Sequence, residues 1–171
     1  SYYQKAKQIM REASEADFKQ ARTSIIYATD GTVIKALQSG KDVYYLSYAD
    51  IPEEVITAMI VTEDKKFFSH EGVDYMANLR AAYSLVKHKG TIYQGGSTIT
   101  QQLARNIYLT NEQTYARKIT EIFLAGELEK RYDKKEILEF YLNNIYFANG
   151  YYGIQAAAHG YFSRGVAELS L

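Results

Sequence analysis

The sequence contains no cysteine, no tryptophan and a single proline among its 171 residues. The lack of cysteine excludes a disulfide framework, a thiolate zinc site and a cysteine nucleophile. Twenty basic and 20 acidic side chains give a formal net charge of zero, which does not support a bulk attraction to nucleic acid. The longest apolar runs, such as residues 123–125, are far shorter than the roughly 20 residues that span a bilayer.

What the chain does contain is typical of one globular domain or part of a larger one. Hydrophobic residues make up 47% and charged residues 23%, a balance that argues against disorder. The 17 tyrosines and the scarcity of proline favour a mostly helical domain rich in amphipathic aromatic side chains.

The first 49 residues are predicted to hold a helix and a small β-hairpin. The N-terminal 22 residues are polar and helix-prone with a thin apolar stripe, which predicts a solvent-facing helix or a connector. The stripe consists of Ala6, Ile9, Ala13 and Ala16. Two β-branched segments, residues 24–27 and 32–34, flank the turn signal Asp30-Gly31 and predict the hairpin. Residues 44–46 are a candidate for a further short strand.

From residue 50 onward, apolar residues recur at helical spacing. The predicted helical segments are residues 50–62, 75–90, 97–107, 110–131, 137–146 and 154–162. Residues with capping preferences mark several of their ends. The predicted caps are the boxes Asp50 with Glu53 and Thr110 through Gln113, the N-cap Ser97 and the C-cap Gly90.

Glu63 and Asp64 directly follow the first of these helices. Acidic side chains are unfavourable at the negative end of a helix dipole, so this placement makes them candidates for a general base. A second carboxylate, Glu121, would complete a pair suited to glycosyl chemistry if the fold brought it across one cleft from Glu63. The alternative is a solvated acidic turn.

The dipeptide Gly95-Gly96 precedes a Ser/Thr-rich helix start at residues 97–102. Free N–H groups and the positive dipole end at such a start suit an anion such as phosphate, although P-loop spacing is absent. The alternative is an ordinary N-cap with polar surface residues. Further on, Arg117 and Lys118 share a helix face with Glu121, either as a cationic patch or as ordinary ion pairs.

These strings occur in an order that resembles the signature motifs of the peptidoglycan glycosyltransferases, glycosyltransferase family 51, of class A penicillin-binding proteins and monofunctional transglycosylases. The strings are Glu63-Asp64-x-x-Phe67-x-x-His70-x-Gly72, Gly96-Ser97-Thr98-Ile99-Thr100-Gln101-Gln102, Arg117-Lys118-x-x-Glu121 and Lys134-x-x-Ile137-Leu138-Glu139-x-Tyr141-Leu142-Asn143. A fifth family element is matched by Gly153, Ala156, Ala157, Tyr161 and Phe162. The chain departs from the family at Ser163, where Gly is usual, and Arg105 stands where Lys is also seen.

The resemblance implies a mainly α, lysozyme-like helical domain with a small N-terminal β-hairpin and a membrane-proximal jaw subdomain. It implies that residues 1–49 are a linker helix and hairpin following a transmembrane anchor that this chain lacks. Residues 50–171 would be the glycosyltransferase domain, with its C-terminal part missing. The jaw is expected around residues 75–95, where aromatic, apolar and lysine side chains suit a membrane interface. The alternative there is a core helix followed by a loop.

The resemblance also implies a reaction. Lipid II is polymerised into β-1,4-linked glycan strands, with inversion at the anomeric carbon and release of undecaprenyl pyrophosphate. Glu63 is expected to be the general base, and His70 to brace the first motif. Glu121 is expected as the second catalytic carboxylate, which orients cations or holds Mg²⁺ or Mn²⁺ on the pyrophosphate; the sequence itself requires no cofactor. The expected substrate-binding residues are Asp64, Phe67, His70, Gly96, Ser97, Thr98, Gln101, Gln102, Arg105, Arg117 and Lys118.

The implied partners are the lipid-linked glycan chain, the membrane surface, moenomycin-type inhibitors and other cell-wall synthesis proteins, with no nucleic acid. The implied location is the extracytoplasmic face of a bacterial cell membrane. Two alternatives stay open. A lysozyme-like hydrolase or lytic transglycosylase would not need the cationic patch, because its leaving group is a sugar. A non-catalytic docking module of the cell-wall machinery would not need the carboxylates.

Overall fold

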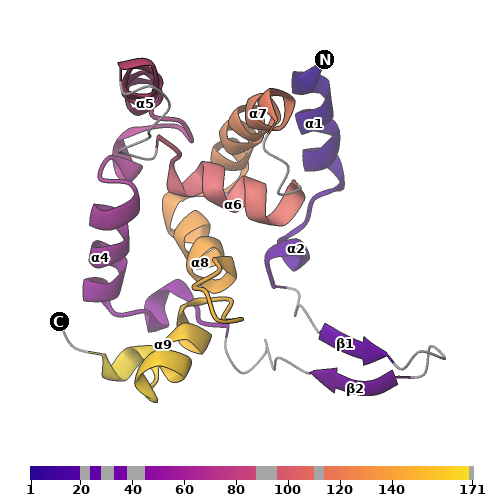
Figure 1. Ribbon diagram of the computed structural model, residues 1–171, viewed down its shortest axis with the longest axis vertical. Helices are drawn as coiled ribbons and strands as arrows, with labels where there is room; N and C mark the ends of the chain where they lie inside the picture. Colours follow the sequence, from indigo (N-terminus) through magenta and orange to yellow (C-terminus); the bar gives the residue numbers. More distant parts are fainter. Residues whose placement is uncertain (20–23, 28–32, 38–44, 88–95, 110–113, 170–171) are drawn as a thin grey trace.

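The computed structural model describes residues 1–19, 24–27, 33–37, 45–87, 96–109 and 114–169 (Figure 1). The helices are α1 (Tyr2–Glu12), α2 (Glu15–Lys19), α4 (Glu53–Glu63), α5 (Tyr75–Lys87), α6 (Ile99–Tyr108), α7 (Tyr115–Arg131), α8 (Lys134–Asn144) and α9 (Ile154–Phe162). Short 3₁₀ turns occur at Tyr48–Asp50, Phe67–Ser69 and Val166–Glu168. The prediction of a mainly helical domain is therefore confirmed.

The core is built around α8, which lies between α4 and the pair α6 and α7 in Figure 1. α6 packs against both α7 and α8. The fully buried apolar side chains of this core include Ile99, Leu103, Leu124, Leu128, Ile137, Leu138 and Leu142. Each such side chain stabilises the fold by about 1.5–3 kcal/mol through removal of apolar area from water. The core thus fixes α6, the helix whose first turn carries the second motif.

The N-terminal helices belong to this core, which corrects the prediction of a solvent-facing helix or connector. α1 packs along α7, and Ala6 is completely buried there because its small side chain lets the two helices approach closely. Phe18 of α2 is also buried and stacks on Phe140 of α8 with ring centroids 4.3 Å apart. The prediction failed because the thin stripe at residues 6, 9, 13 and 16 left out Met10 and Phe18, which are both buried.

The predicted hairpin is present. β1 (Ser24–Tyr27) and β2 (Val33–Leu37) pair in antiparallel fashion from Ser24 opposite Leu37 to Tyr27 opposite Val33, and they project from the helical body in Figure 1. The predicted turn at Asp30-Gly31 lies outside the described residues. The further strand is wrong for Tyr45 and Leu46, which are not in a strand; Tyr44 lies outside the described residues.

Two predicted helix starts are wrong near residues 50 and 97. Asp50 belongs to a 3₁₀ turn and accepts a hydrogen bond from Ser47 Oγ at 2.6 Å, so it does not cap α4, whose N-cap is Pro52. The N-cap of α6 is Thr98 rather than Ser97: its side chain accepts from the Gln101 N–H in a complete capping box. Because Thr98 caps the helix in place of Ser97, the Ser97 hydroxyl can make another contact.

The long helix α7 ends at Arg131 as predicted, but its start is different. The N-cap is Thr114, whose hydroxyl accepts from the Arg117 N–H at 3.1 Å. The box predicted at residues 110–113 therefore does not cap this helix, and those residues lie outside the described part, as does Gly90.

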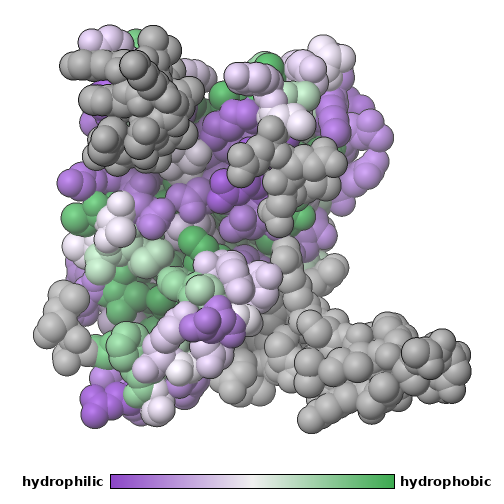
Figure 2. Space-filling view, in the orientation of Figure 1, coloured by the Kyte–Doolittle hydropathy of each residue, from purple (hydrophilic) through white to green (hydrophobic). Residues whose placement is uncertain are grey.

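Four aromatic and apolar side chains of α5 face solvent, which disagrees with a core helix over residues 75–83, the part of α5 where the structure describes them. Tyr75, Met76, Leu79 and Tyr83 are between 58% and 74% exposed. On the face shown in Figure 2, hydrophobic residues also gather beside the lower part of α4, whereas hydrophilic residues cover much of α6 and α7. Within the described ranges, no helix combines the length and apolar character needed to cross a membrane.

Candidate active site

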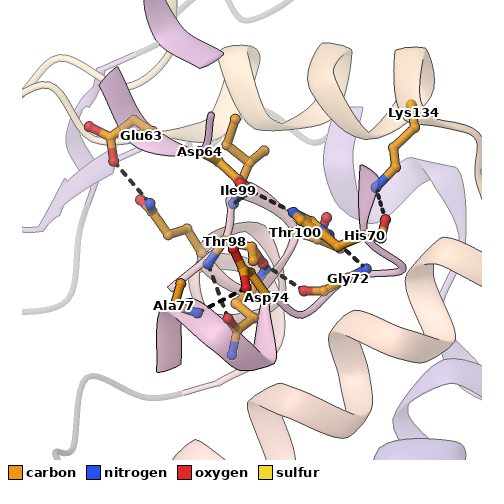
Figure 3. A network of polar contacts seen from close by, with 12 residues as sticks. Glu63, Asp64, His70, Gly72, Asp74, Ala77, Thr98, Ile99, Thr100 and Lys134 are labelled. Carbon is orange, nitrogen blue, oxygen red and sulfur yellow. Dashed lines mark hydrogen bonds and ion pairs between the residues drawn. The ribbon is translucent and has the colours of Figure 1, made fainter. Parts of the chain in front are cut away.

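Glu63 is the last residue of α4, and its carboxylate is exposed to solvent. Its Oε2 accepts a hydrogen bond from Nε2 of Gln102, on α6, at 3.0 Å (Figure 3). Two helices that are distant in sequence therefore orient one accessible carboxylate. This is the geometry that a general base requires, because the group must be reachable by substrate and still be held.

The neighbouring carboxylate, Asp64, is buried and has a different environment. Its Oδ2 lies 2.8 Å from Nε2 of His70 and accepts the Ile99 N–H at 3.0 Å. Asp64 thus supplies the anion at the positive end of α6. Two N–H groups at this helix start are already bound within the protein, the Ile99 N–H by Asp64 and the Gln101 N–H by Thr98, and the anion site there stays a prediction.

His70 connects this acid to the loop that follows. Its Nδ1 accepts the Gly72 N–H at 3.1 Å, so Nε2 carries the proton and donates to Asp64. Both ring nitrogens are used within the protein, which agrees with a bracing role. Gly72 has φ +89°, and a Cβ there would lie 2.7 Å from the Ala125 carbonyl oxygen of α7. Its carbonyl accepts from Thr98 Oγ1 at 2.6 Å, which closes the loop onto α6.

A second cluster lies at the start of α7. The Glu121 carboxylate accepts from Nη1 of Arg117 at 2.6 Å and from Nζ of Lys118 at the other oxygen. Lys118 Nζ also donates to Ser97 Oγ at 2.7 Å, directly before α6. The Glu121 side chain is 1% exposed, whereas those of Arg117 and Lys118 are 16% and 34% exposed. The acid is enclosed and holds two cations that remain partly accessible.

The surroundings of Glu121 do not fit a divalent ion. Mg²⁺ and Mn²⁺ prefer several oxygen ligands, but both oxygens of this carboxylate already accept from cations. Within the part of the chain that the structure describes, no group of three or more histidine, aspartate or glutamate residues could hold a metal ion. The positive charge at this position comes from Arg117 and Lys118.

Tyr141 of α8 supports the Glu63 side of the site. Its buried hydroxyl donates to Gln102 Oε1 at 3.3 Å, so the Gln102 amide bridges Tyr141 and Glu63. Burial, and then the negative charge of Glu63, raise the Tyr141 pKa, while the nearby cation Arg105 opposes this shift. Tyr141 therefore stays protonated and remains a donor at neutral pH.

Comparison with known proteins identifies the family. The family described as Transglycosylase matches residues 30–171. This chain belongs to the transglycosylase family. Similar relatives include Penicillin-binding protein 4 of Bacillus subtilis, 44% identical over 156 residues, which are 91% of this chain and 25% of the relative. Penicillin-binding protein 1A of Aquifex aeolicus is 53% identical over 129 residues, 75% of this chain and 18% of the relative. Penicillin-binding protein 1A of Escherichia coli is 45% identical over 159 residues, 91% of this chain and 18% of the relative.

The transglycosylase domain is therefore a glycosyltransferase of the cell-wall, peptidoglycan-synthesising kind. The chain spans between 18% and 25% of the length of these relatives. Its helical architecture agrees with the lysozyme-like fold that the motifs implied.

The transglycosylase structure separates the predicted site residues into accessible and enclosed groups. The buried group consists of Asp64, Phe67, Thr98, Gln101 and Glu121. The predicted residues with at least partial exposure are Glu63, His70, Gly96, Ser97, Gln102, Arg105, Arg117 and Lys118. Sequence reasoning missed Tyr141 and Glu129 as supporting residues. Tyr141 could have been found from the sequence, because it is part of the fourth motif. Glu129 could not, because nothing in its spacing distinguishes it from a surface residue.

Proposed function

We propose that this transglycosylase domain polymerises lipid II into β-1,4-linked glycan strands, with inversion at the anomeric carbon and release of undecaprenyl pyrophosphate. One observation supports this most directly. Gln102 of α6 binds the accessible carboxylate of Glu63, and Ser97, directly before α6, binds Lys118. Glu121 holds Lys118 together with the second cation, Arg117. A base and a leaving-group site are thus attached to the same rigid element.

Glu63 would act as the general base. A sugar 4-hydroxyl is a weak nucleophile at neutral pH, so its proton must be removed during attack. The acceptor oxygen forms a bond to the donor anomeric carbon while the bond from that carbon to the pyrophosphate oxygen breaks. The proton passes to the Glu63 carboxylate, and the single displacement inverts the anomeric centre.

Arg117 and Lys118 would stabilise the departing pyrophosphate. This group leaves readily, and it requires positive charge and hydrogen bonds rather than a proton donor as negative charge develops on it. Glu121 would keep both cations oriented. Ser97, Gln102 and Arg105 would contact the sugars and phosphates.

The enclosure of Glu121 favours this transferase over the lysozyme-like hydrolase. A glycosidase needs two carboxyl groups that face the scissile bond, one of them as a proton donor. Glu121 has a 1% exposed side chain and two bound cations, so it is not such a second group. A pyrophosphate leaving group has no need of that acid.

The exposed face of α5 would rest on the membrane that contains the lipid-linked substrate. Its aromatic and apolar side chains suit the interface between headgroups and acyl chains. We place the domain on the extracytoplasmic side of the membrane, with moenomycin-type inhibitors competing for the lipid-linked glycan site and other cell-wall synthesis proteins as partners.

The reaction class can be tested with two substrates. The protein that carries this chain is incubated with labelled lipid II and, separately, with purified sacculi, and products are separated by gel and by chromatography. We expect glycan ladders from lipid II and no soluble fragments from sacculi. Fragments from sacculi without ladders would favour the hydrolase. No product from either, with detergent and divalent cation varied, would favour the docking module.

A further inference from the structure

Lys134, the first residue of α8, reaches into the loop that follows Asp64. Its Nζ donates to the His70 carbonyl oxygen at 2.6 Å and to Glu129 Oε1 at 2.7 Å, and it lies 4.4 Å from the centre of the Phe67 ring. Figure 3 shows the side chain extending from its helix to the carbonyl of His70. One ammonium group therefore contacts the loop backbone, a carboxylate and an aromatic face.

The contact with His70 connects Lys134 to the proposed base. The His70 ring is hydrogen-bonded to Asp64, and Asp64 is the residue that follows Glu63 and binds the Ile99 N–H. A shift of the His70 backbone would move this ring and with it the end of α4. Lys134 thus holds one end of a short chain of contacts whose other end is Glu63.

The contact with Glu129 joins the same ammonium to α6. The Oε1 atom of Glu129 accepts from Lys134 and also from the Thr100 hydroxyl, both at 2.7 Å. Thr100 is in the first turn of α6, next to Ile99, which binds Asp64. The contacts form a closed ring that runs from α6 through Glu129 and Lys134 to the loop and back to α6. The ring fixes the end of α4 relative to the helix that carries Gln102.

We propose that Lys134 is a positioning residue for Glu63 and acts through the backbone of His70. This inference rests on the proposed function of Glu63 as the base. Lys134 does not contact substrate; it sets the distance and direction of the carboxylate relative to the attacking hydroxyl. A misplacement of about 1 Å can cost on the order of 100-fold in rate. Loss of this contact should therefore lower kcat and leave KM nearly unchanged.

The test must separate positioning from simple ion pairing. Lys134→Met keeps a long apolar side chain but leaves the Glu129 carboxylate, 8% exposed, without its cation. Lys134→Met/Glu129→Gln removes both charges, and the new amide can still accept from Thr100. We expect this double variant to keep a melting temperature within about 3 °C of wild type. Its kcat on labelled lipid II should fall on the order of 100-fold, with KM within about 3-fold.

Two further variants serve as comparisons. Lys135→Met removes the exposed lysine next along α8 and should leave kcat and KM unchanged. Glu129→Gln alone keeps the Lys134 contact with His70, so we expect its kcat to exceed that of Lys134→Met by at least about 10-fold. If the double variant does not fold, the difference in kcat between Glu129→Gln and Lys134→Met tests the positioning role instead.

A double variant with wild-type kcat would overturn the positioning role, as would equal losses of kcat in the two single variants. A Glu63→Gln control separates this inference from the proposed function. If Glu63→Gln is inactive while the double variant has wild-type kcat, only the role of Lys134 is wrong. If Glu63→Gln retains full kcat, the proposed base is wrong and the inference is lost with it.

Discussion

Two adjacent carboxylates in this domain, Glu63 and Asp64, have different surroundings. Glu63 is exposed and has a single amide donor, whereas Asp64 is buried between a histidine and the start of a helix. The sequence indicates that both acids stand at a helix end, and it selects Glu63 through the family resemblance. It does not show which acid is buried, because burial depends on α6 and on the loop around His70. The sequence likewise does not show that Phe67 and Gln101, which were expected to bind substrate, are buried.

At the scale of single residues, Gly72 gives a direct test of the loop geometry. Gly72→Ala should lower the free energy of unfolding by at least about 2 kcal/mol, because a Cβ is disfavoured at positive φ and would collide with the Ala125 backbone. Gly126→Ala, on α7, is the matched control. A Cβ there meets nothing within 4 Å, so we expect stabilisation of about 0.5–1 kcal/mol from helix propensity alone. Urea titration measures both, and equal effects would contradict the described loop.

At the scale of secondary structure, the start of α6 joins the two halves of the site. Its apolar stripe was readable from sequence, since Ile99 and Leu103 are buried as predicted. The predicted N-cap was off by one residue, because Ser97 and Thr98 are both favoured capping residues and only the packed geometry selects Thr98. The Ser97 hydroxyl is then available to Lys118, a contact that no local pattern predicts.

The cations of α7 should contribute to the rate. Lys118→Ala removes an ammonium proposed to stabilise the leaving group, and loss of one such donor lowers kcat by about 100-fold or more. Lys130→Ala, on the same helix, is the control, since this exposed lysine pairs only with Glu127 among the described contacts. We expect Lys130→Ala to polymerise lipid II at the wild-type rate. A wild-type rate for Lys118→Ala would remove this cation from the proposed mechanism.

α5 has a capping residue that the sequence reading missed. Asp74 Oδ1 accepts the Ala77 N–H at 2.9 Å, and this backbone hydrogen bond lowers the Asp74 pKa below its ordinary value. Because the folded pKa is depressed, the stabilisation is present above about pH 4 and is lost as pH falls through the folded pKa. Asp74→Ala should weaken α5 by about 1 kcal/mol at neutral pH.

Amide hydrogen exchange along α5 measures this effect. Wild type is compared with Asp74→Ala at pH 7 and near pH 3, with rates corrected for the intrinsic pH dependence of exchange. The two proteins should differ at pH 7, and the difference should be smaller near pH 3 because that pH lies below the pKa of an unfolded aspartate. Asp50→Ala is the control, because Asp50 does not cap a long helix. A constant difference at both pH values would exclude the carboxylate cap.

At the scale of the whole molecule, the order of the motifs predicted the fold class better than local patterns did. The mainly helical architecture and the hairpin agree with prediction, but contacts between distant segments do not follow from periodicity. The packing of α1 on α7 and the stacking of Phe18 on Phe140 are examples. Such contacts depend on which small or aromatic side chains meet once the chain has folded.

The exposed face of α5 carries a prediction about the membrane. Met76→Ser/Leu79→Ser should reduce partitioning into vesicles of anionic and zwitterionic lipid by about 10-fold or more, because burial of each apolar side chain contributes about 1.5–3 kcal/mol. Val61→Ser, at an exposed apolar position on α4, is the control and should have little effect. Co-sedimentation with vesicles measures both, and equal partitioning of all three proteins would contradict a membrane-facing α5.

The identity of the base is the most direct test of the whole account. Polymerisation of labelled lipid II is followed over time for wild type, Glu63→Gln and Glu54→Gln, the last being an exposed acid at the other end of the same helix. We predict glycan ladders from wild type and from Glu54→Gln, and none from Glu63→Gln, which retains the shape but cannot accept the proton. Ladders of normal length and rate from Glu63→Gln would contradict the assignment of the base.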